Sequence, residues 1–463
     1  MILRFSAWLR LPSCLLVLAA VVPIHANSVE IDFTRYLASH AVGPMAADAD
    51  PIAFFGVPGS ARLIVTSSGN TIDAAIHVNG LQVLAPPAAI TNGVLEVPIT
   101  LGEENTIAVG SSGAAHSQIA VRVKQKADVE LNVLSRVHFN TNVSDFAAAR
   151  EFYGKLGLET LSGFPDTNTL EMAQAIGIDT PTAYDGSQGE AAGGYLLHGE
   201  LVGFGFFGGV IDLIEFTIPR NDEPPYDALN HLGMARAVMR TTNIAADYAY
   251  MKEQGVEFIS APATRSDGTQ FAIFRDLDGT HYELMAVDGE DEDTETTHIV
   301  GLGRVNINVS DFERSRAWYQ MLGFEVTKQL PGTESIEVAS AMGFDDVFEI
   351  EGAIVTHRAD RSALELVQWI KPYDPQRAYP VPINHLGIHR MAFSTSDIDA
   401  DVAALRSQGV EFISDVTPCC SGPDSSGGIV AFYDPDGTII ELVEQPGLSQ
   451  LLAAWLWLRN LFD

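Results

Sequence analysis

Polar side chains that can do chemistry recur at two-residue spacing along segments expected to form strands. His281 and Glu283 lie two residues apart in the segment HYELM, so both side chains project to one face of a strand. Asn140 and Asn142 share a face of the segment HFNTNV in the same way. An imidazole beside a carboxylate is a ligand pair for Fe(II), Mn(II) or Zn(II). Amides at this spacing either donate hydrogen bonds to a bound molecule or satisfy one another when buried.

The elements that would position these residues occur twice in the chain. Residues 143–157 read VSDFAAAREFYGKLG, and residues 309–323 read VSDFERSRAWYQMLG. A segment that begins NHLG starts at residues 230 and 384, and a segment with D-x-D-G starts at residues 276 and 434. A duplicated unit with the same landmarks in the same order predicts two tandem modules. We place them at residues 133–287 and 299–446, joined by an acidic linker at 288–298.

Each module is expected to contain two βαβββ units, which makes the fold α+β. A strand comes first, and the helix after it begins at Asp145 or Asp311, which are suitable caps. The second half of each module repeats this order and ends in the strands HYELM and IIELVE.

The flanking segments suggest three further parts. Residues 28–130 alternate apolar and polar residues between Gly, Asn and Pro turns, which predicts a small antiparallel β-domain resembling a sandwich. Residues 1–26 have Arg4 and Arg10 before a short apolar run, which is typical of a signal peptide and predicts a periplasmic or secreted protein. The apolar run is too short for a membrane span, so none is expected after cleavage. Residues 447–463 form an expected amphipathic C-terminal helix.

The charge of the chain narrows the range of partners. The formal net charge is −33, from 60 acidic and 27 basic residues. Such a surface repels phosphate backbones, so nucleic acid is excluded as a partner and a small molecule is expected instead. Homo-oligomerisation is left open by the sequence.

The paired motifs carry a resemblance to a known family. The V-S-D strand–helix start, the NHLG segment and the terminal D-P-D-G-x-x-x-E-L resemble the vicinal oxygen chelate superfamily, across roughly residues 133–446. This group includes glyoxalase I, extradiol dioxygenases and bleomycin resistance proteins. The resemblance implies that each module pairs its two units into an open cup, with a divalent metal held by the first and last strands of each unit.

In the first module, the resemblance places the four ligand positions on His138, Asp212, Arg236 and Glu283. Together with His281, this predicts a metal site of His138, His281, Glu283 and Asp212 for Fe, Mn or Zn. Glu283 and Arg236 are the expected catalytic residues, with Arg236 pairing with a substrate anion. The alternative is that Arg236 neutralises the two carboxylates and no metal binds.

In the second module, the same positions fall on Arg304, Glu365, Arg390 and Glu441. A guanidinium cannot ligate a metal, because it does not deprotonate in proteins. No metal is therefore expected in this module. These four residues, with Asn140, Asn142 and Arg236, are instead the candidates for binding a substrate.

Three functions follow from these alternatives. The first is an exported metal-dependent lyase, isomerase or dioxygenase that acts on a small oxygenated molecule in the first module. The second is a metal-free small-molecule binder of the bleomycin-resistance type. The third is a degenerate scaffold that presents the β-domain.

Overall fold

The N-terminal part of the chain forms two four-stranded antiparallel sheets. The computed structural model describes residues 27–34, 51–55, 58–67, 73–85, 94–102, 104–112, 119–129, 131–163, 170–178, 195–205, 209–289, 297–374, 376–419, 426–445, 451 and 455. One sheet has the strand order β1 (Asn27–Thr34), β8 (Ile119–Val129), β3 (Gly59–Ser67) and β6 (Val94–Leu101). The other has the order β2 (Ile52–Phe55), β7 (Glu104–Ser112), β4 (Asp73–Val78) and β5 (Leu81–Leu84). Their buried side chains, among them Leu63, Val65 and Ile76, form one cluster, so this region has its own core.

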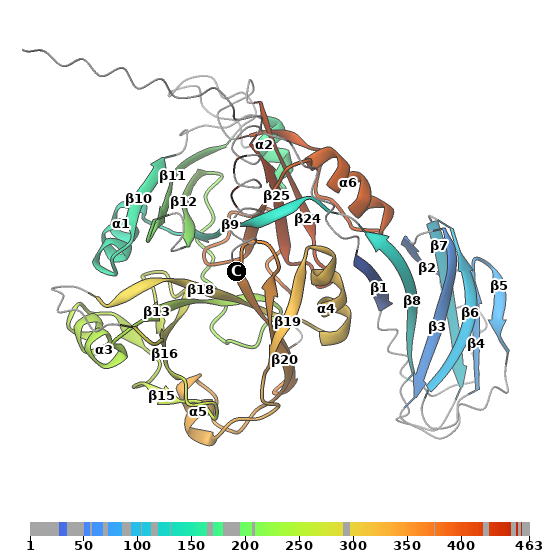
Figure 1. Ribbon diagram of the computed structural model, residues 1–463, viewed down its shortest axis with the longest axis horizontal. Coiled ribbons are helices and arrows are strands. Elements are labelled where there is room, and N and C mark those ends of the chain that lie inside the picture. The colour runs from blue at the N-terminus through green and yellow to red at the C-terminus, as the bar shows by residue number, and fades with distance from the viewer. Residues whose placement is uncertain are drawn as a thin grey trace, which may run out of the picture.

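The two modules form two curled mixed sheets rather than one sheet each (Figure 1). The first sheet has the strand order β10 (Glu159–Gly163), β11 (Leu196–Gly203), β12 (Val210–Ile218), β9 (Val133–Asn142), β22 (Arg390–Thr395), β25 (Ile439–Glu444), β24 (Gly427–Tyr433) and β23 (Thr417–Cys419). The second sheet has the order β14 (Glu257–Phe258), β16 (Gln270–Arg275), β17 (His281–Ala286), β13 (Gly233–Thr241), β18 (Ile299–Asn308), β21 (Ala363–Lys371), β20 (Glu349–His357) and β19 (Phe324–Gln329), with β15 (Ala263–Thr264) paired to β16. Each sheet therefore joins the first unit of one module to the second unit of the other.

This pairing corrects the expectation that each module closes its own cup. The central contact of the first sheet is the antiparallel pair β9–β22, and that of the second is β13–β18. The NHLG segments fix the choice, because Asn384 donates a side-chain hydrogen bond to the carbonyl of Pro219 in the opposite module. Asn230 does the same to Pro372 at an equal distance of 3.0 Å. Units of different modules thus share one sheet and meet at its centre.

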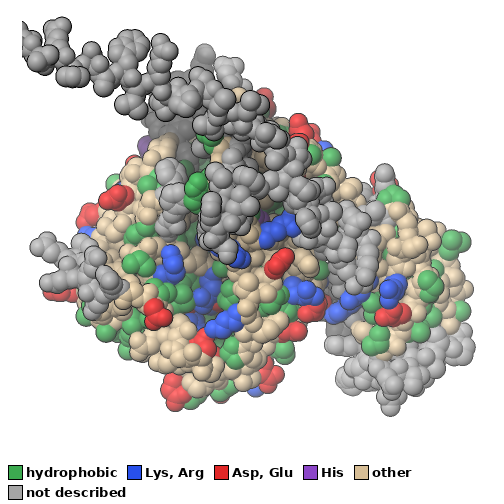
Figure 2. All heavy atoms as spheres, in the orientation of Figure 1, with side chains coloured by type: hydrophobic (Ala, Val, Ile, Leu, Met, Phe, Trp, Pro, Cys, Tyr) green, Lys and Arg blue, Asp and Glu red, His purple; other side chains and the backbone are tan. Residues whose placement is uncertain are grey.

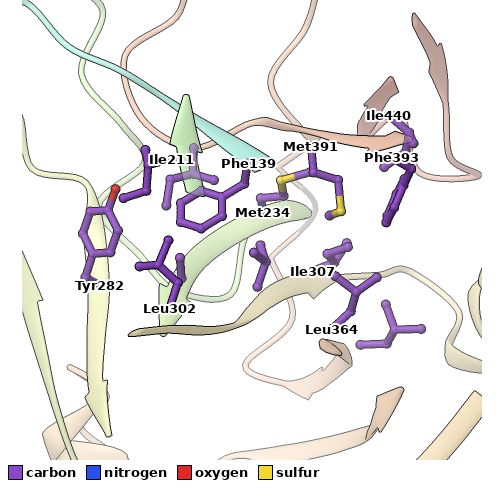
Figure 3. Packing of buried hydrophobic residues seen from close by; sticks show 14 of the residues in the cluster. Phe139, Ile211, Met234, Tyr282, Leu302, Ile307, Leu364, Met391, Phe393 and Ile440 are labelled. Atoms are coloured by element: carbon purple, nitrogen blue, oxygen red, sulfur yellow. The ribbon is translucent and has the colours of Figure 1, made fainter. Parts of the chain in front are cut away.

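Units of the same module meet back to back instead. The largest apolar cluster lies between the two sheets, where Phe139, Ile211 and Met391 of the first sheet face Met234, Tyr282 and Leu302 of the second (Figure 3). The side chains of the four long helices complete this cluster. They are α1 (Phe146–Lys155), α3 (Ile244–Glu253), α4 (Phe312–Met321) and α6 (Ile398–Ser407). The remaining face of each sheet is left free to line a cup.

Asp145 and Asp311 cap their helices as the sequence predicts. Their side chains accept hydrogen bonds from the backbone N–H groups of Ala148 and Arg314. Asp311 also receives the guanidinium of Arg122 on β8 at 2.9 Å, and β1 packs against α4. These contacts attach the N-terminal sheets to the second module.

Two short helices that the sequence did not indicate cover the inner faces of the cups. They are α2 (Leu170–Ala175) in the first module and α5 (Ile336–Ala341) in the second. The first contacts β23 and β24, and the second contacts β15. Each helps to form a small apolar cluster, which includes Met172 and Ile429 in one cup and Met342 and Trp369 in the other.

Several expected segments lie outside the described residues. They are the signal peptide at 1–26, most of the acidic linker at 288–298 and most of the C-terminal helix at 447–463. Within the described ranges, no helix is both long and apolar enough to cross a membrane.

Candidate functional site

The first cup holds a charged cluster of four residues, which we call the His138 cluster. His138 on β9, Asp212 on β12, Arg390 on β22 and Glu441 on β25 come together because these four strands are neighbours in the first sheet. His138 Nε2 lies 3.6 Å from Asp212 Oδ2 and 3.9 Å from Glu441 Oε2. Arg390 donates to Asp212 and lies 3.2 Å from Glu441 through its Nε. One guanidinium thus faces two buried carboxylates.

Several polar atoms of the His138 cluster lack partners. Both ring nitrogens of His138 and the Oδ1 atom of Asp212 are buried without a hydrogen-bond partner in the described part of the chain. Burial would raise the pKa of Glu441, but Arg390 and His138 outweigh burial and hold that pKa below its usual range. Arg390 and His138 therefore keep the Glu441 carboxylate ionised.

In the second cup, the equivalent positions carry partly different residues. We call this set the Arg304 cluster. It contains Arg236 on β13, Glu283 on β17, Arg304 on β18, Glu365 on β21 and Arg265 just after β15. Arg236 donates from Nε to Glu283 Oε2 at 2.9 Å and from Nη2 to Glu365. Arg304 donates from Nε to Glu365 Oε2 at 2.6 Å, and its Nη2 lies 3.6 Å from Glu283 Oε1.

Arg265 is the member that sequence reasoning missed. Its Nη1 and Nη2 donate to the two oxygens of Glu283, each at 2.9 Å, which is the bidentate fork geometry that favours Arg–carboxylate pairs. Its guanidinium also lies 3.8 Å from the ring centre of Phe271. Its position could have been inferred from the S-D-G-T turn that follows it in the sequence, which places Arg265 at the end of a short hairpin strand.

The arginines keep both carboxylates of the Arg304 cluster ionised. Burial alone would raise the pKa of Glu283, but Arg265, Arg236 and Arg304 outweigh it and hold this pKa well below its usual range. The pKa of Glu365 is lowered in the same way, by Arg236 and Arg304 against the effect of burial. Three guanidiniums therefore surround two carboxylates, and the cluster carries an excess of one positive charge.

A cavity opens directly above the Arg304 cluster. Its volume is about 340 Å³, and all three arginines of the cluster line it. Much of its wall is apolar, with Met285, Val338, Met342, Phe348, Ile354 and Trp369 among the lining residues, and Asp267, Lys328 and Glu334 line it as well. A concave apolar site with a few convergent polar groups is typical of small-molecule binding, and this volume lies at the small end of such sites.

The structure divides the predicted metal-ligand set between the two cups. His138 and Asp212 lie on the first sheet, whereas His281 and Glu283 lie on the second, because units of different modules share each sheet. His281 accepts a hydrogen bond on Nε2 from Arg275 at 3.2 Å, and burial, then Arg275, lowers its pKa to about 4. The four residues therefore form no single site. In the described ranges, no group of three or more His, Cys, Asp or Glu is arranged to hold a metal ion.

The two predicted asparagine ligands hold a loop in place. The Asn142 amide donates to the carbonyls of Ile383 and His385 at 2.6 and 2.7 Å. Asn140 donates to Asn142 Oδ1 and accepts from the backbone N–H of Arg390 at 3.0 Å. Both amides are buried, and these contacts attach the second NHLG loop to β9.

A comparison with protein families identifies the modules. The model of the Glyoxalase/Bleomycin resistance protein/Dioxygenase superfamily matches residues 135–284 and 301–442, more than half of the chain. The chain belongs to this superfamily. The two matches fall within the two modules expected from the repeats, and they leave the N-terminal sheets outside the superfamily region.

Solved structures of glyoxalase-type proteins align with parts of the chain at low sequence identity. Glyoxalase I from Zea mays aligns with a TM-score of 0.45 and 17% identity, over 68% of this chain and 94% of that chain. A glyoxalase family protein from Bacillus cereus aligns with a TM-score of 0.29 and 20% identity, over 34% of this chain and 100% of that chain. A Mn(II)-bound glyoxalase from Novosphingobium aromaticivorans aligns with a TM-score of 0.23 and 13% identity, over 68% and 83% of the two chains. The comparison with curated proteins found no match.

The superfamily metal can be tested against the donor atoms of each cup. The four superfamily ligand positions of the second cup are Arg236, Glu283, Arg304 and Glu365, and these residues do not fit a metal, because guanidiniums occupy both carboxylates. The first cup offers one imidazole and two carboxylates, with Arg390 at the fourth position. Arg390 is ion-paired with both carboxylates, and among the described residues these donors are not arranged as a metal site, so an ion held by His138, Asp212 and Glu441 would require the three side chains to move.

Proposed function

We propose that the protein is a metal-independent binder of a small organic molecule, and that the ligand occupies the cavity above the Arg304 cluster. The observation that carries this proposal is the salt-bridged set Arg236, Glu283, Arg304 and Glu365 at the positions where a superfamily metal would sit. A cavity of about 340 Å³ with partly apolar walls lies above this set. The cavity is thus equipped to bind a molecule but not to activate it through a metal.

The proposal is tested by blocking the cavity. Ile354 is half-buried and lines it, so Ile354→Trp fills the space without inserting a ring into the packed core. The probe is N-phenyl-1-naphthylamine, an uncharged aromatic dye that fluoresces in apolar sites. Val326→Trp is the matched control, since Val326 lies on the neighbouring strand β19, is exposed and does not line the cavity.

We expect the dye to bind the wild type and Val326→Trp alike, with about a tenfold or greater loss in Ile354→Trp, which is a cost of roughly 1.4 kcal/mol or more. Binding should survive dialysis against a chelator. Equal dye affinity in Ile354→Trp and the wild type would overturn the proposed site.

A second candidate function, a metal-dependent enzyme, is favoured by one observation in the first cup. The buried ring nitrogens of His138 and the Oδ1 atom of Asp212 make no hydrogen bond with any described residue, and Nε2 of His138 lies 3.6 Å from Asp212 Oδ2. A divalent ion held there would polarise an oxygen of a bound substrate as a Lewis acid. His138, Asp212 and Glu441 would orient the ion, and Arg390 would hold the two carboxylates in position.

Elemental analysis of the purified protein separates the two functions. Stoichiometric Fe, Mn or Zn that is lost in His138→Ala supports the enzyme. Protein that is folded and metal-free in both forms supports the binder. Export is a further part of the proposal, supported by the basic and apolar pattern of residues 1–26, and fractionation of cells with detection of the processed N-terminus tests it.

A further inference from the structure

We infer that the ligand of this cavity is an organic monocarboxylate, whose carboxylate lies against Arg236 and Arg304 and whose apolar body lies against Trp369 and Phe348. This inference deepens the proposed binding function and rests on it. It is carried by the guanidinium N–H groups that the carboxylates of the cluster leave unused.

The carboxylates do not satisfy all the donors at the floor of the cavity. Arg236 uses Nε and Nη2 for Glu283 and Glu365, and its Nη1 makes no hydrogen bond with any described residue. Among the described residues, Nη1 of Arg304 has only the sulfur of Met285 as its partner, at 3.0 Å. A thioether is a weak acceptor, so a charged guanidinium N–H directed at it would gain from a carboxylate oxygen.

The net charge of the Arg304 cluster, which forms the cavity floor, also favours a ligand with a single negative charge. Three guanidiniums against two carboxylates leave an excess of one positive charge, in a chain whose formal net charge is −33. At the rim, Lys328 is paired with Asp267, and Glu334 accepts hydrogen bonds from Ser266. Figure 2 shows Lys and Arg side chains gathered over β13, β18 and β19, with hydrophobic side chains among them. A monoanion would neutralise the floor, whereas a dianion would leave one charge buried without a counter-ion.

The walls define the rest of the ligand. Trp369 donates its indole N–H to Asn308 Oδ1 at 2.9 Å, so its polar atom is satisfied and its ring presents apolar surface. Phe348 lies 5.2 Å from the Trp369 ring, and Met342 and Val338 of the α5 region line the same wall. Aromatic and aliphatic surface of this kind is suited to an aromatic or alkyl body attached to the carboxylate.

The test is a competition experiment with a matched pair of ligands. Phenylacetate and phenylacetamide have nearly the same shape and differ in charge, and each is used to displace N-phenyl-1-naphthylamine from the wild-type protein. We expect phenylacetate to displace the dye at about a tenfold lower concentration, because charge-assisted hydrogen bonds to guanidinium are roughly twice as strong as neutral ones. Equal potency of the two compounds overturns the inference.

Substitutions of arginine then test which residue causes the preference for phenylacetate over phenylacetamide. In Arg304→Gln the advantage of phenylacetate should disappear, while Arg316→Gln, an exposed arginine paired with Glu313 on α4, should retain it. Arg304→Lys keeps the charge and loses the fork, so it should show an intermediate preference even if Arg304→Gln folds poorly. A preference that persists unchanged in both Arg304 variants assigns the anion to another site and overturns the inference.

The outcomes also separate this inference from the function on which it rests. If the dye binds the wild type but not Ile354→Trp, and the acid and amide compete equally, the cavity binds ligands but does not select anions. If the dye binds Ile354→Trp as well as the wild type, the binding function itself fails.

Discussion

The two cups are built on one scaffold and differ in charge. Corresponding positions carry the same type of side chain at Asp212 and Glu365, at Glu441 and Glu283, and at Arg390 and Arg236. Two positions carry different residues in the two cups. His138 corresponds to Arg304, and the registers of the β23–β24 and β15–β16 pairs show that Cys419 corresponds to Arg265. Cys419 is buried and disulfide-bonded, and its partner lies outside the described residues.

These two differences reverse the excess charge. The His138 cluster has one guanidinium for two carboxylates, whereas the Arg304 cluster has three guanidiniums for two carboxylates. The same arrangement of strands can therefore carry a cluster with an excess of negative charge, which favours cations, or a cluster with an excess of positive charge, which favours anions. The residue on the first strand, His138 or Arg304, and the residue at the β23–β24 or β15–β16 pairing decide which one results. The shared arginine is ion-paired with the carboxylates in both cups.

The largest expected effect comes from removing that shared arginine in each cup. Arg390→Met leaves Asp212 and Glu441 buried without a guanidinium, whereas Arg236→Met leaves Arg265 and Arg304 in place. Loss of one partner from a buried ion pair costs about 3–5 kcal/mol, so we expect Arg390→Met near the top of this range and Arg236→Met near or below the bottom. Urea denaturation at pH 7 measures the free energy of unfolding of both variants. A larger loss for Arg236→Met would show that Arg265 and Arg304 do not substitute for it.

The scaffold was predictable from sequence to the level of the units, but their pairing was not. The duplicated motifs predicted two modules of βαβββ units, and the family comparison confirms the two modules. All four units carry similar patterns, so periodicity gives no preference for one partner over another. Contacts such as the one from Asn384 to Pro219 decide the pairing, and no local pattern reveals them.

The candidate site was predictable by position but not by grouping. Each strand position that the resemblance assigned lies in one of the two clusters, yet His138 and Glu283 were placed together and lie on different sheets. Arg265 was missed because it follows a strand of two residues, too short to show any periodicity. Tertiary pairing, rather than local propensity, determines which charges meet.

His281 gives a second way to separate the cups, because its counterpart in the first cup is Ile439. Burial, then Arg275, lowers the pKa of His281 to about 4, so the folded state holds fewer protons than the unfolded state between pH 6.5 and 4. Above pH 6.5, His281 is neutral in both states and does not lower the free energy of unfolding. As the pH falls through this window, the free energy of unfolding decreases, by about 2 kcal/mol at pH 5 and about 3 kcal/mol at pH 4.

His281→Ile, which installs the residue of the other cup, should flatten the acid side of the stability profile by these amounts. Urea midpoints measured from pH 7.5 to 4.5 test the difference. Ile439→Val, a small change at the equivalent position, should leave the slope of the profile unchanged. Parallel wild-type and His281→Ile profiles would mean that His281 does not contribute to acid sensitivity.

The scaffold asparagines should behave alike in the two cups. Asn142 and Asn308 each donate to two carbonyls of the NHLG loop in the opposite module, at distances of 2.6–2.7 Å. Replacing either with Leu leaves two buried carbonyls without that donor, at a cost of about 2 kcal/mol. We expect the two variants to agree within about 1 kcal/mol in urea denaturation. A large inequality would show that one cup depends on its loop more than the other does.

The smallest expected effect lies at the rim of the second cup, where exposed contacts replace buried ones. The turn at residues 265–269 carries Arg265 and is attached across the cavity mouth, because Ser266 donates from its backbone N–H and its hydroxyl to Glu334, each at 3.0 Å. Exposed contacts of this type contribute about 0–1 kcal/mol, so Glu334→Ala should change the free energy of unfolding by less than about 1 kcal/mol. The same variant should release N-phenyl-1-naphthylamine faster in stopped-flow dilution, because the turn at the cavity mouth has lost one of its two attachments and keeps only the pair between Asp267 and Lys328. Glu313→Ala, an exposed carboxylate on α4 away from the cavity, is the control and should leave the release rate unchanged. Unchanged release in Glu334→Ala would show that the turn does not limit access to the cavity, and that the floor alone distinguishes the two cups.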